Sequence, residues 1–190
     1  FKPDKSTIYD SKKYAIEGSA LKLKNGAKIK NSDLFNAMLV GSTNNTARMV
    51  AQATGLSEKA FVADINKKLD NWDADDTVIT DVTGLGAGNK STARNLLKIF
   101  TKIMGNEQIK TSLGKSKYSF KELPSKVGAV SHTITNTNQL ISTTNKNYKI
   151  LATKTGYTDE AGSVLLMLIE TKNTHKQYVV ITLNNPDYKN

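Results

Sequence analysis

Two short polar strings, far apart in the chain, contain the residue types of a serine-based acyl-transfer site. Ser42-Thr43-Asn44 supplies a hydroxyl and an amide, and Lys154-Thr155-Gly156 supplies an ammonium group. Each string is common by chance, and Ser42 alone is accounted for by an ordinary helix cap. The strings predict acyl-transfer chemistry only if the fold brings them together.

A site of this kind also needs a nucleophile with its base, usually a Ser-x-x-Lys string upstream of Ser42. Ser19-Ala20-Leu21-Lys22 is upstream, but it enters a predicted strand. Residues three apart on a strand point to opposite faces, so Lys22 could not deprotonate Ser19. Ser112-Leu113-Gly114-Lys115 comes after Ser42, at the end of a predicted helix. We interpret both strings as incidental to catalysis.

The second polar string follows the apolar run 150–152 and is therefore expected on a strand. Alternation then places Lys154 and Gly156 on one face and Thr155 on the other. Gly156 has no side chain, so a ligand backbone can lie close to the strand. The backbone N–H of Tyr157 could donate to an oxyanion.

The first half of the chain is predicted to be mostly helical. Predicted helix caps are Ser32, Ser57 and Ser91, and glycines are the expected helix ends. Before them, residues 20–30 are predicted to form a hairpin that turns at Asn25-Gly26. The core face expected for the helix after Ser91 comprises Leu96, Leu97, Phe100, Ile103 and Met104.

The second half is predicted to consist of strands. Four runs that are β-branched or apolar are separated by polar turns: 130–135, 149–153, 163–170 and 177–183. Helices followed by strands indicate an α+β fold, with a helical subdomain beside an antiparallel sheet. We expect residues 1–190 to form a single domain.

Composition excludes several functions. The 190 residues are 38% hydrophobic, and the longest apolar run, 164–169, is too short to span a bilayer. The net charge is +10, but of 27 basic residues only Arg48 and Arg94 are arginine, which disfavours sequence-specific nucleic-acid binding. A lysine-rich surface fits attraction to an anionic matrix such as a bacterial cell wall, or a simple solvated surface.

The remaining candidate sites are unconvincing. His132 and His175 lack acidic neighbours for a metal site, and the Asp73–Asp76 cluster lacks an EF-hand's glycine and closing glutamate. The glycine loop 84–88 lacks the Gly-Lys-Ser ending of a phosphate-binding loop. We therefore expect no metal and no cofactor.

Six segments in order resemble a known enzyme family over nearly the whole chain. They are Glu17-Gly18-Ser19-Ala20, the stretch 33–47, the stretch 61–66, Thr83-Gly84-Leu85 with Ser91-Thr92-Ala93, Asn136-Thr137-Asn138, and Lys154-Thr155-Gly156-Tyr157-Thr158. Together they resemble the low-molecular-weight penicillin-binding proteins, in particular the serine-type D-alanyl-D-alanine carboxypeptidases. The resemblance implies a β-lactamase/transpeptidase-like fold and no cofactor.

The resemblance also implies a role for each matching residue. Ser42 would pass protons between the base and the leaving amine, and Asn44 would hold the substrate amide. Lys154 and Thr155 would bind the terminal carboxylate next to Gly156, and the Tyr157 N–H would complete the oxyanion hole. Thr43-Asn44-Asn45 departs mildly from the family's Gly-Asn-Asp.

The resemblance further implies an extracytoplasmic enzyme, at the cell wall or the outer face of the cytoplasmic membrane of a Gram-positive bacterium. It would remove D-alanine from peptidoglycan stem peptides ending in D-Ala-D-Ala through an acyl-serine intermediate, with β-lactams as covalent inhibitors. Nucleic acid is not an expected partner, and membrane association would need further segments.

The family's nucleophile segment, its earlier strands and its last helix are not recognised in the sequence. We therefore expect a chain truncated at the N-terminus, and at the C-terminus too, that is inactive alone. The alternative is a noncatalytic wall-binding module with the same fold.

Overall fold

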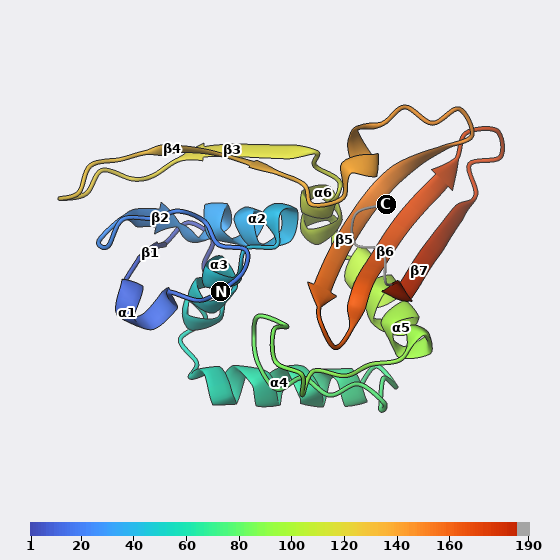
Figure 1. Cartoon of the computed structure of the whole chain (residues 1–190), viewed down its shortest axis with the longest axis horizontal. Coiled ribbons are helices and arrows are strands. Elements are labelled where there is room, and N and C mark those ends of the chain that lie inside the picture. The colour runs from blue at the N-terminus through green and yellow to red at the C-terminus, as the bar shows by residue number, and fades with distance from the viewer. Residues whose placement is uncertain (186–190) are drawn as a thin grey trace.

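The computed structural model describes residues 1–185, which form helices and three separate antiparallel sheets (Figure 1). Its elements in chain order are β1 (Ser6–Ile8), α1 (Ser11–Tyr14), β2 (Lys28–Lys30), α2 (Asn31–Gly41), α3 (Asn44–Gln52), α4 (Glu58–Asp70), α5 (Ala93–Met104), α6 (Glu107–Leu113), β3 (Lys117–Lys121), β4 (Ser131–Thr135), the 3-10 turn Gln139–Ser142, β5 (Tyr148–Thr158), β6 (Gly162–Thr171) and β7 (Gln177–Asn185). This mixture confirms the predicted α+β class.

The predicted hairpin over residues 20–30 is wrong in its pairing. β2 pairs with β1, and residues 20–24 form no strand. The reason is a side chain distant in sequence: Asn45 accepts a hydrogen bond from Leu21 N (2.9 Å) and donates one to Leu21 O (2.8 Å). The backbone of Leu21 is thereby satisfied without a neighbouring strand. The turn itself is correct, because Gly26 has φ of +90°.

The helix caps agree with expectation only in part. Ser57 Oγ accepts from Ala60 N and caps α4 as predicted. α5 is capped by Thr92 rather than Ser91, whose hydroxyl bonds Thr77 Oγ1 instead. α2 begins one residue before Ser32.

The core-face prediction for α5 is also mixed. Phe100 and Met104 are buried as expected, whereas Leu97 is 45% exposed. The expectation that Leu97 faces the core is therefore wrong, and the burial of α5 is concentrated on a narrower face.

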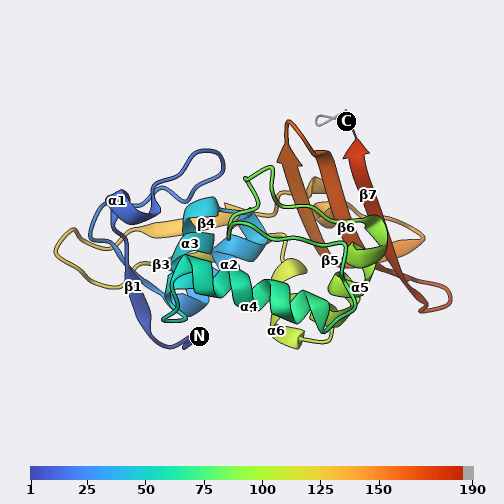
Figure 2. The ribbon, with the colours of Figure 1, turned by 90° about the horizontal axis from the view of Figure 1, so that it is seen from below.

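The β5–β6–β7 sheet has α5 and α6 on one side (Figures 1 and 2). Phe100, Leu113, Ala152 and Leu168 form the buried cluster between these helices and the sheet. All four predicted strand runs are present as β4 to β7, although β5 continues to Thr158 and so includes the whole second polar string.

A second layer forms where the β3–β4 hairpin extends over α2 (Figure 1). Ile134 of β4 packs with Ala37 and Val40 of α2. Gly41 makes this approach possible, because a Cβ there would lie 2.4 Å from Ile134 Cγ2. This packing places β4 of the β3–β4 sheet directly against the end of α2.

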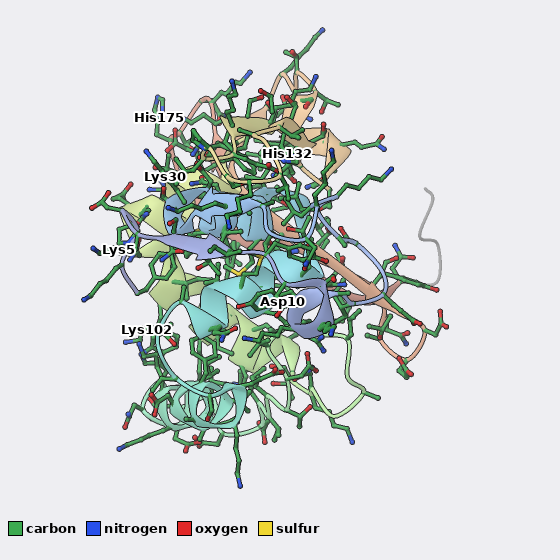
Figure 3. All side chains as sticks on the ribbon, turned by 90° about the vertical axis from the view of Figure 1, so that its left-hand side faces the viewer. Lys5, Asp10, Lys30, Lys102, His132 and His175 are labelled. Carbon is green, nitrogen blue, oxygen red and sulfur yellow. The ribbon has the colours of Figure 1, made fainter. Side chains whose placement is uncertain are left out.

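Surface lysines such as Lys5, Lys30 and Lys102 extend from the ribbon (Figure 3). Within residues 1–185, no helix is long and apolar enough to cross a membrane.

Candidate active site

Ser42 lies in the sharp turn between α2 and α3. Its backbone is left-handed, with φ of 52° and ψ of 40°, which is unusual for a residue other than glycine. The preceding Gly41 is pressed against Ile134 and the following Thr43 is 7% exposed, so the packing on both sides fixes this conformation. Non-glycine residues in this region cost free energy and concentrate at functional sites.

The structure brings the two polar strings together. Lys154 Nζ lies 2.6 Å from Ser42 Oγ and donates to it, although the two residues are 112 positions apart. Lys154 Nζ also donates to its neighbour's carbonyl, Thr155 O, at 2.6 Å. Burial lowers the pKa of Lys154 to about 8. The Lys154 side chain can therefore give up a proton and take one back near neutral pH.

Asn44 makes its contacts with the segment of residues 17–21 rather than with Lys154. Asn44 N donates to Ser19 O at 2.7 Å, and Asn44 Nδ2 donates to Glu17 O at 3.1 Å. Gly18 has φ of +79°, and a Cβ there would lie 3.1 Å from Asn44 Nδ2. This segment therefore crosses directly over the start of α3.

Neither Ser-x-x-Lys string is arranged as a nucleophile with its base. Ser19 Oγ donates to Gly41 O at 3.2 Å, and Lys22 is exposed. Ser112 is 2% exposed, and its hydroxyl donates to Asn36 Oδ1 at 3.0 Å. Each hydroxyl thus bonds a group outside its own string, but the prediction of a strand at Ser19 is wrong because residues 20–24 form no strand.

The two neighbours of Lys154 on β5, Thr153 and Thr155, both bond residues of the string 136–138. Thr155 Oγ1 donates to Thr137 Oγ1 at 2.5 Å, and Thr153 Oγ1 accepts from Asn138 Nδ2 at 2.8 Å. The string 136–138 thus lies along β5 beside Lys154, with Asn138 only 6% exposed. Thr137 was not among the predicted site residues, although the family-like Asn136-Thr137-Asn138 string pointed to it.

The end of β5 leaves room beside the strand. A Cβ added at Gly156 would have a single neighbour, Val164 Cβ at 3.9 Å. The Tyr157 side chain is 47% exposed, and its hydroxyl donates to Asp159 at 3.0 Å. Gly156 and Tyr157 therefore continue from Lys154 toward solvent.

The glycine loop 84–88 is organised around a carboxylate of its own. Asp81 accepts hydrogen bonds from the backbone N–H groups of Thr83, Gly84 and Gly86. Partial burial raises the pKa of Asp81, but hydrogen bonds from Thr83, Asn89 and Gly86 outweigh it and lower the pKa to about 2. These N–H groups are thus engaged within the loop.

The expectation that His132 and His175 lack acidic neighbours is wrong, because each lies beside a different carboxylate. His132 bonds the buried Glu122 at 2.7 Å, and His175 lies 3.5 Å from Glu170. Among the described residues, no cluster of three or more His, Asp or Glu side chains could hold a metal ion.

Comparison with known sequences gives the same family as the resemblance. The family profile described as D-alanyl-D-alanine carboxypeptidase (Peptidase_S11) matches residues 4–186. A D-alanyl-D-alanine endopeptidase of Haemophilus influenzae is 28% identical over 170 residues, covering 90% of this chain and 56% of that protein. One of Pseudomonas aeruginosa is 30% identical over 171 residues, covering 87% and 52%. The chain spans about half the length of these curated relatives.

Solved structures share the fold. The Streptomyces K15 DD-transpeptidase has a TM-score of 0.87 at 23% identity, over 98% of this chain and 74% of that one. A D-alanyl-D-alanine carboxypeptidase of Mycobacterium tuberculosis has a TM-score of 0.81 at 22% identity, over 96% and 66%. These likenesses confirm the transpeptidase-like fold.

Proposed function

The chain belongs to the D-alanyl-D-alanine carboxypeptidase family, and on this premise we propose that it forms the acceptor half of a serine-type peptidase site. The substrate is a peptidoglycan stem peptide that ends in D-Ala-D-Ala, and the reaction passes through an acyl-serine intermediate. The observation that carries this proposal is the 2.6 Å contact between Lys154 Nζ and Ser42 Oγ. We place the protein outside the cytoplasm, at the cell wall of a Gram-positive bacterium.

Ser42 and Lys154 transfer protons, and Lys154 also binds the negatively charged carboxylate of the substrate. With a pKa of about 8, Lys154 is mostly protonated at pH 7. Its ammonium group can therefore bind a substrate carboxylate, and it can also transfer a proton through Ser42 Oγ. Ser42 then delivers a proton to the leaving D-alanine amine. Because this pair is half-buried and burial lowers the pKa of the Lys154 ammonium, its charge acts on the substrate with less screening than a charge at the surface.

Asn44, Thr155 and Tyr157 orient the substrate. Asn44 Nδ2 is engaged with Glu17 O, so we assign its Oδ1 to the substrate amide N–H. Thr155 Oγ1 joins Lys154 at the carboxylate, and Gly156 lets the peptide backbone lie against β5. We assign the Tyr157 N–H to the oxyanion hole.

We assign the nucleophile to a Ser-x-x-Lys segment outside these 190 residues, because neither string within them has the required geometry. The chain by itself is then expected to form no acyl-enzyme, since loss of the nucleophile costs several orders of magnitude in rate. β-Lactams are expected to acylate the complete protein.

Labelling with a fluorescent penicillin tests this function. We expect covalent labelling of the complete protein, and we expect Lys154→Ala to reduce it at least about a hundredfold because carboxylate binding and proton transfer are both lost. Ser19→Ala is the matched control and should label like the wild type, since Ser19 Oγ only bonds Gly41 O. Unlabelled wild-type protein with an intact upstream Ser-x-x-Lys, or equal loss in both variants, would refute the proposal.

A second candidate is a noncatalytic wall-binding module that keeps the carboxylate-binding half of the site. It is favoured by the geometry of the two Ser-x-x-Lys strings together with the net charge of +10. In this case Lys154 and Thr155 hold the D-Ala-D-Ala carboxylate without any bond being broken.

A further inference from the structure

The later Ser-x-x-Lys string directs both of its polar side chains at one atom of α2. Ser112 Oγ and Lys115 Nζ donate to Asn36 Oδ1, at 3.0 Å and 2.8 Å. Ser112 is 2% exposed and Asn36 is 8% exposed. Breaking a buried hydrogen bond leaves a desolvated polar group unpaired, so this arrangement resists displacement. It joins the end of α6 to the middle of α2.

A second contact joins the same two regions. Lys115 Nζ lies 4.8 Å from the ring centroid of Tyr118, whose hydroxyl donates to Asp33 Oδ1 at 2.6 Å. Asp33 and Asn36 are three residues apart and share one face of α2. α2 is therefore held at two points by residues at the end of α6 and just after it.

The end of α6 is also fixed against β5. A Cβ on Gly114 would lie 2.5 Å from Leu151 O, so the backbone of α6 ends directly on the strand, three residues before Lys154. Lys115 O accepts a hydrogen bond from Asn136 Nδ2 at 2.9 Å. Thr137, the residue after Asn136, accepts a hydrogen bond from Thr155, the neighbour of Lys154.

We propose that Asn36, Ser112 and Lys115 form a positioning junction that fixes the end of α2 relative to β5 and so keeps Ser42 Oγ within reach of Lys154 Nζ. From Asn36, about 9 Å of helix leads to Ser42, and a helix of this length transmits a displacement rigidly. The catalytic meaning of the junction depends on the proposed function, but its effect on Lys154 does not.

The pKa of Lys154, followed by NMR of ¹³C-labelled lysine side chains, tests the junction without any turnover. In Asn36→Leu, both donors lose their acceptor, so one of the two points that hold α2 is lost. Water then reaches Lys154, and we expect its pKa to rise from about 8 by roughly one unit or more.

Asn66→Leu is the matched control. Asn66 makes hydrogen bonds with Val62 O and with both backbone polar groups of Ile79, which tie α4 to the following segment; none of these bonds involves α2 or α6. We expect it to lower the unfolding temperature while the Lys154 pKa stays at the wild-type value.

An unchanged Lys154 pKa in folded Asn36→Leu, or an equal rise in Asn66→Leu, would overturn the proposal. If Asn36→Leu does not fold, the Ser112→Ala/Lys115→Met double variant removes both donors and should raise the Lys154 pKa in the same way. An unchanged pKa in that variant would likewise reject the junction. Absence of penicillin labelling would count against the proposed function alone.

Discussion

At the scale of single residues, the site depends on one ammonium group held under unusual conditions. Lys154 is buried beside neutral oxygens, Ser42 Oγ and Thr155 O, rather than beside a carboxylate. Burial therefore works against the charged form without an opposing ion pair, and the pKa falls from 10.5 to about 8. A structural ion pair would have had the opposite effect on this pKa.

This shift predicts a pH-dependent cost in stability. The pKa of Lys154 is lower in the folded chain, so the unfolded chain binds more protons between about pH 8 and pH 10.5. The free energy of unfolding should therefore rise with pH in this window relative to Lys154→Met. At pH 7 the charged lysine costs about 3 kcal/mol, and Lys154→Met should be more stable by up to that amount.

Urea unfolding of wild type and Lys154→Met at pH 7 and pH 10 measures this difference. Titrating groups that the two proteins share cancel in the comparison. A stability difference that is the same at both pH values would contradict the assigned burial of the ammonium.

At the scale of elements, close backbone approaches position the site. Gly41 lets β4 lie against the end of α2, and Gly114 lets α6 end on β5. Each glycine lies where an added methyl group would meet another element. Ser42 and Lys154 meet because α2 and β5 are each packed this tightly.

Gly41→Ala should therefore destabilise the protein. The new Cβ would lie 2.4 Å from Ile134 Cγ2, and relieving the clash should cost roughly 1–3 kcal/mol. Adding Ile134→Ala removes the clashing methyl, so the double variant should lose less stability than the sum of the two single variants.

Thermal unfolding of the four proteins measures this coupling. Gly156→Ala is the steric control, because its Cβ would meet only Val164 at 3.9 Å. If the losses of stability in Gly41→Ala and Ile134→Ala were additive in the double variant, the close contact between Gly41 and Ile134 would not be the cause of the destabilisation.

Elements with strong local patterns could be predicted from the sequence, and elements fixed by distant contacts could not. β6 and β7 coincide with long apolar runs of the sequence. Ser57 caps α4, as the local sequence pattern predicts. The strand predicted over residues 20–24 is not formed because the side chain of Asn45, on α3, makes the backbone hydrogen bonds of Leu21. β1 was missed because three residues carry too little pattern.

The site shows the same division. The pairing of Ser42 with Lys154 was predictable only through the order of six family-like strings, since 112 residues separate the two. No local pattern could show that Asn36 joins Ser112 and Lys115, because their contact depends on how α2 packs against α6.

At the scale of the whole molecule, the charge is distributed outside the site. Among the described residues, Lys110 and Lys149 are the lysines with an ion pair to a carboxylate, while the net charge is +10. Such a surface attracts anionic polymers at long range, and this attraction weakens with salt. Binding through Lys154 is local and buried, so the two effects can be separated.

Calorimetry on the 190-residue chain separates them and tests the wall-binding alternative. With a D-Ala-D-Ala peptide, we expect saturable heat that persists at about 0.5 M salt and disappears in Lys154→Ala, since the buried ammonium is weakly screened. Lys102→Ala, at an exposed position, is the control and should bind normally. Heat that vanishes with salt and is indifferent to Lys154→Ala would identify a nonspecific polyanion binder instead.

The left-handed backbone of Ser42 has a consequence for how this protein can be engineered. Glycine adopts this conformation freely, so Ser42→Gly would relax the turn while removing the hydroxyl that meets Lys154. Selection for thermostability alone would therefore favour a residue that abolishes the proposed proton transfer through Ser42. Position 42 is thus a point of conflict between stability and function, and a library screened only by melting temperature would drift toward well-folded, catalytically silent variants.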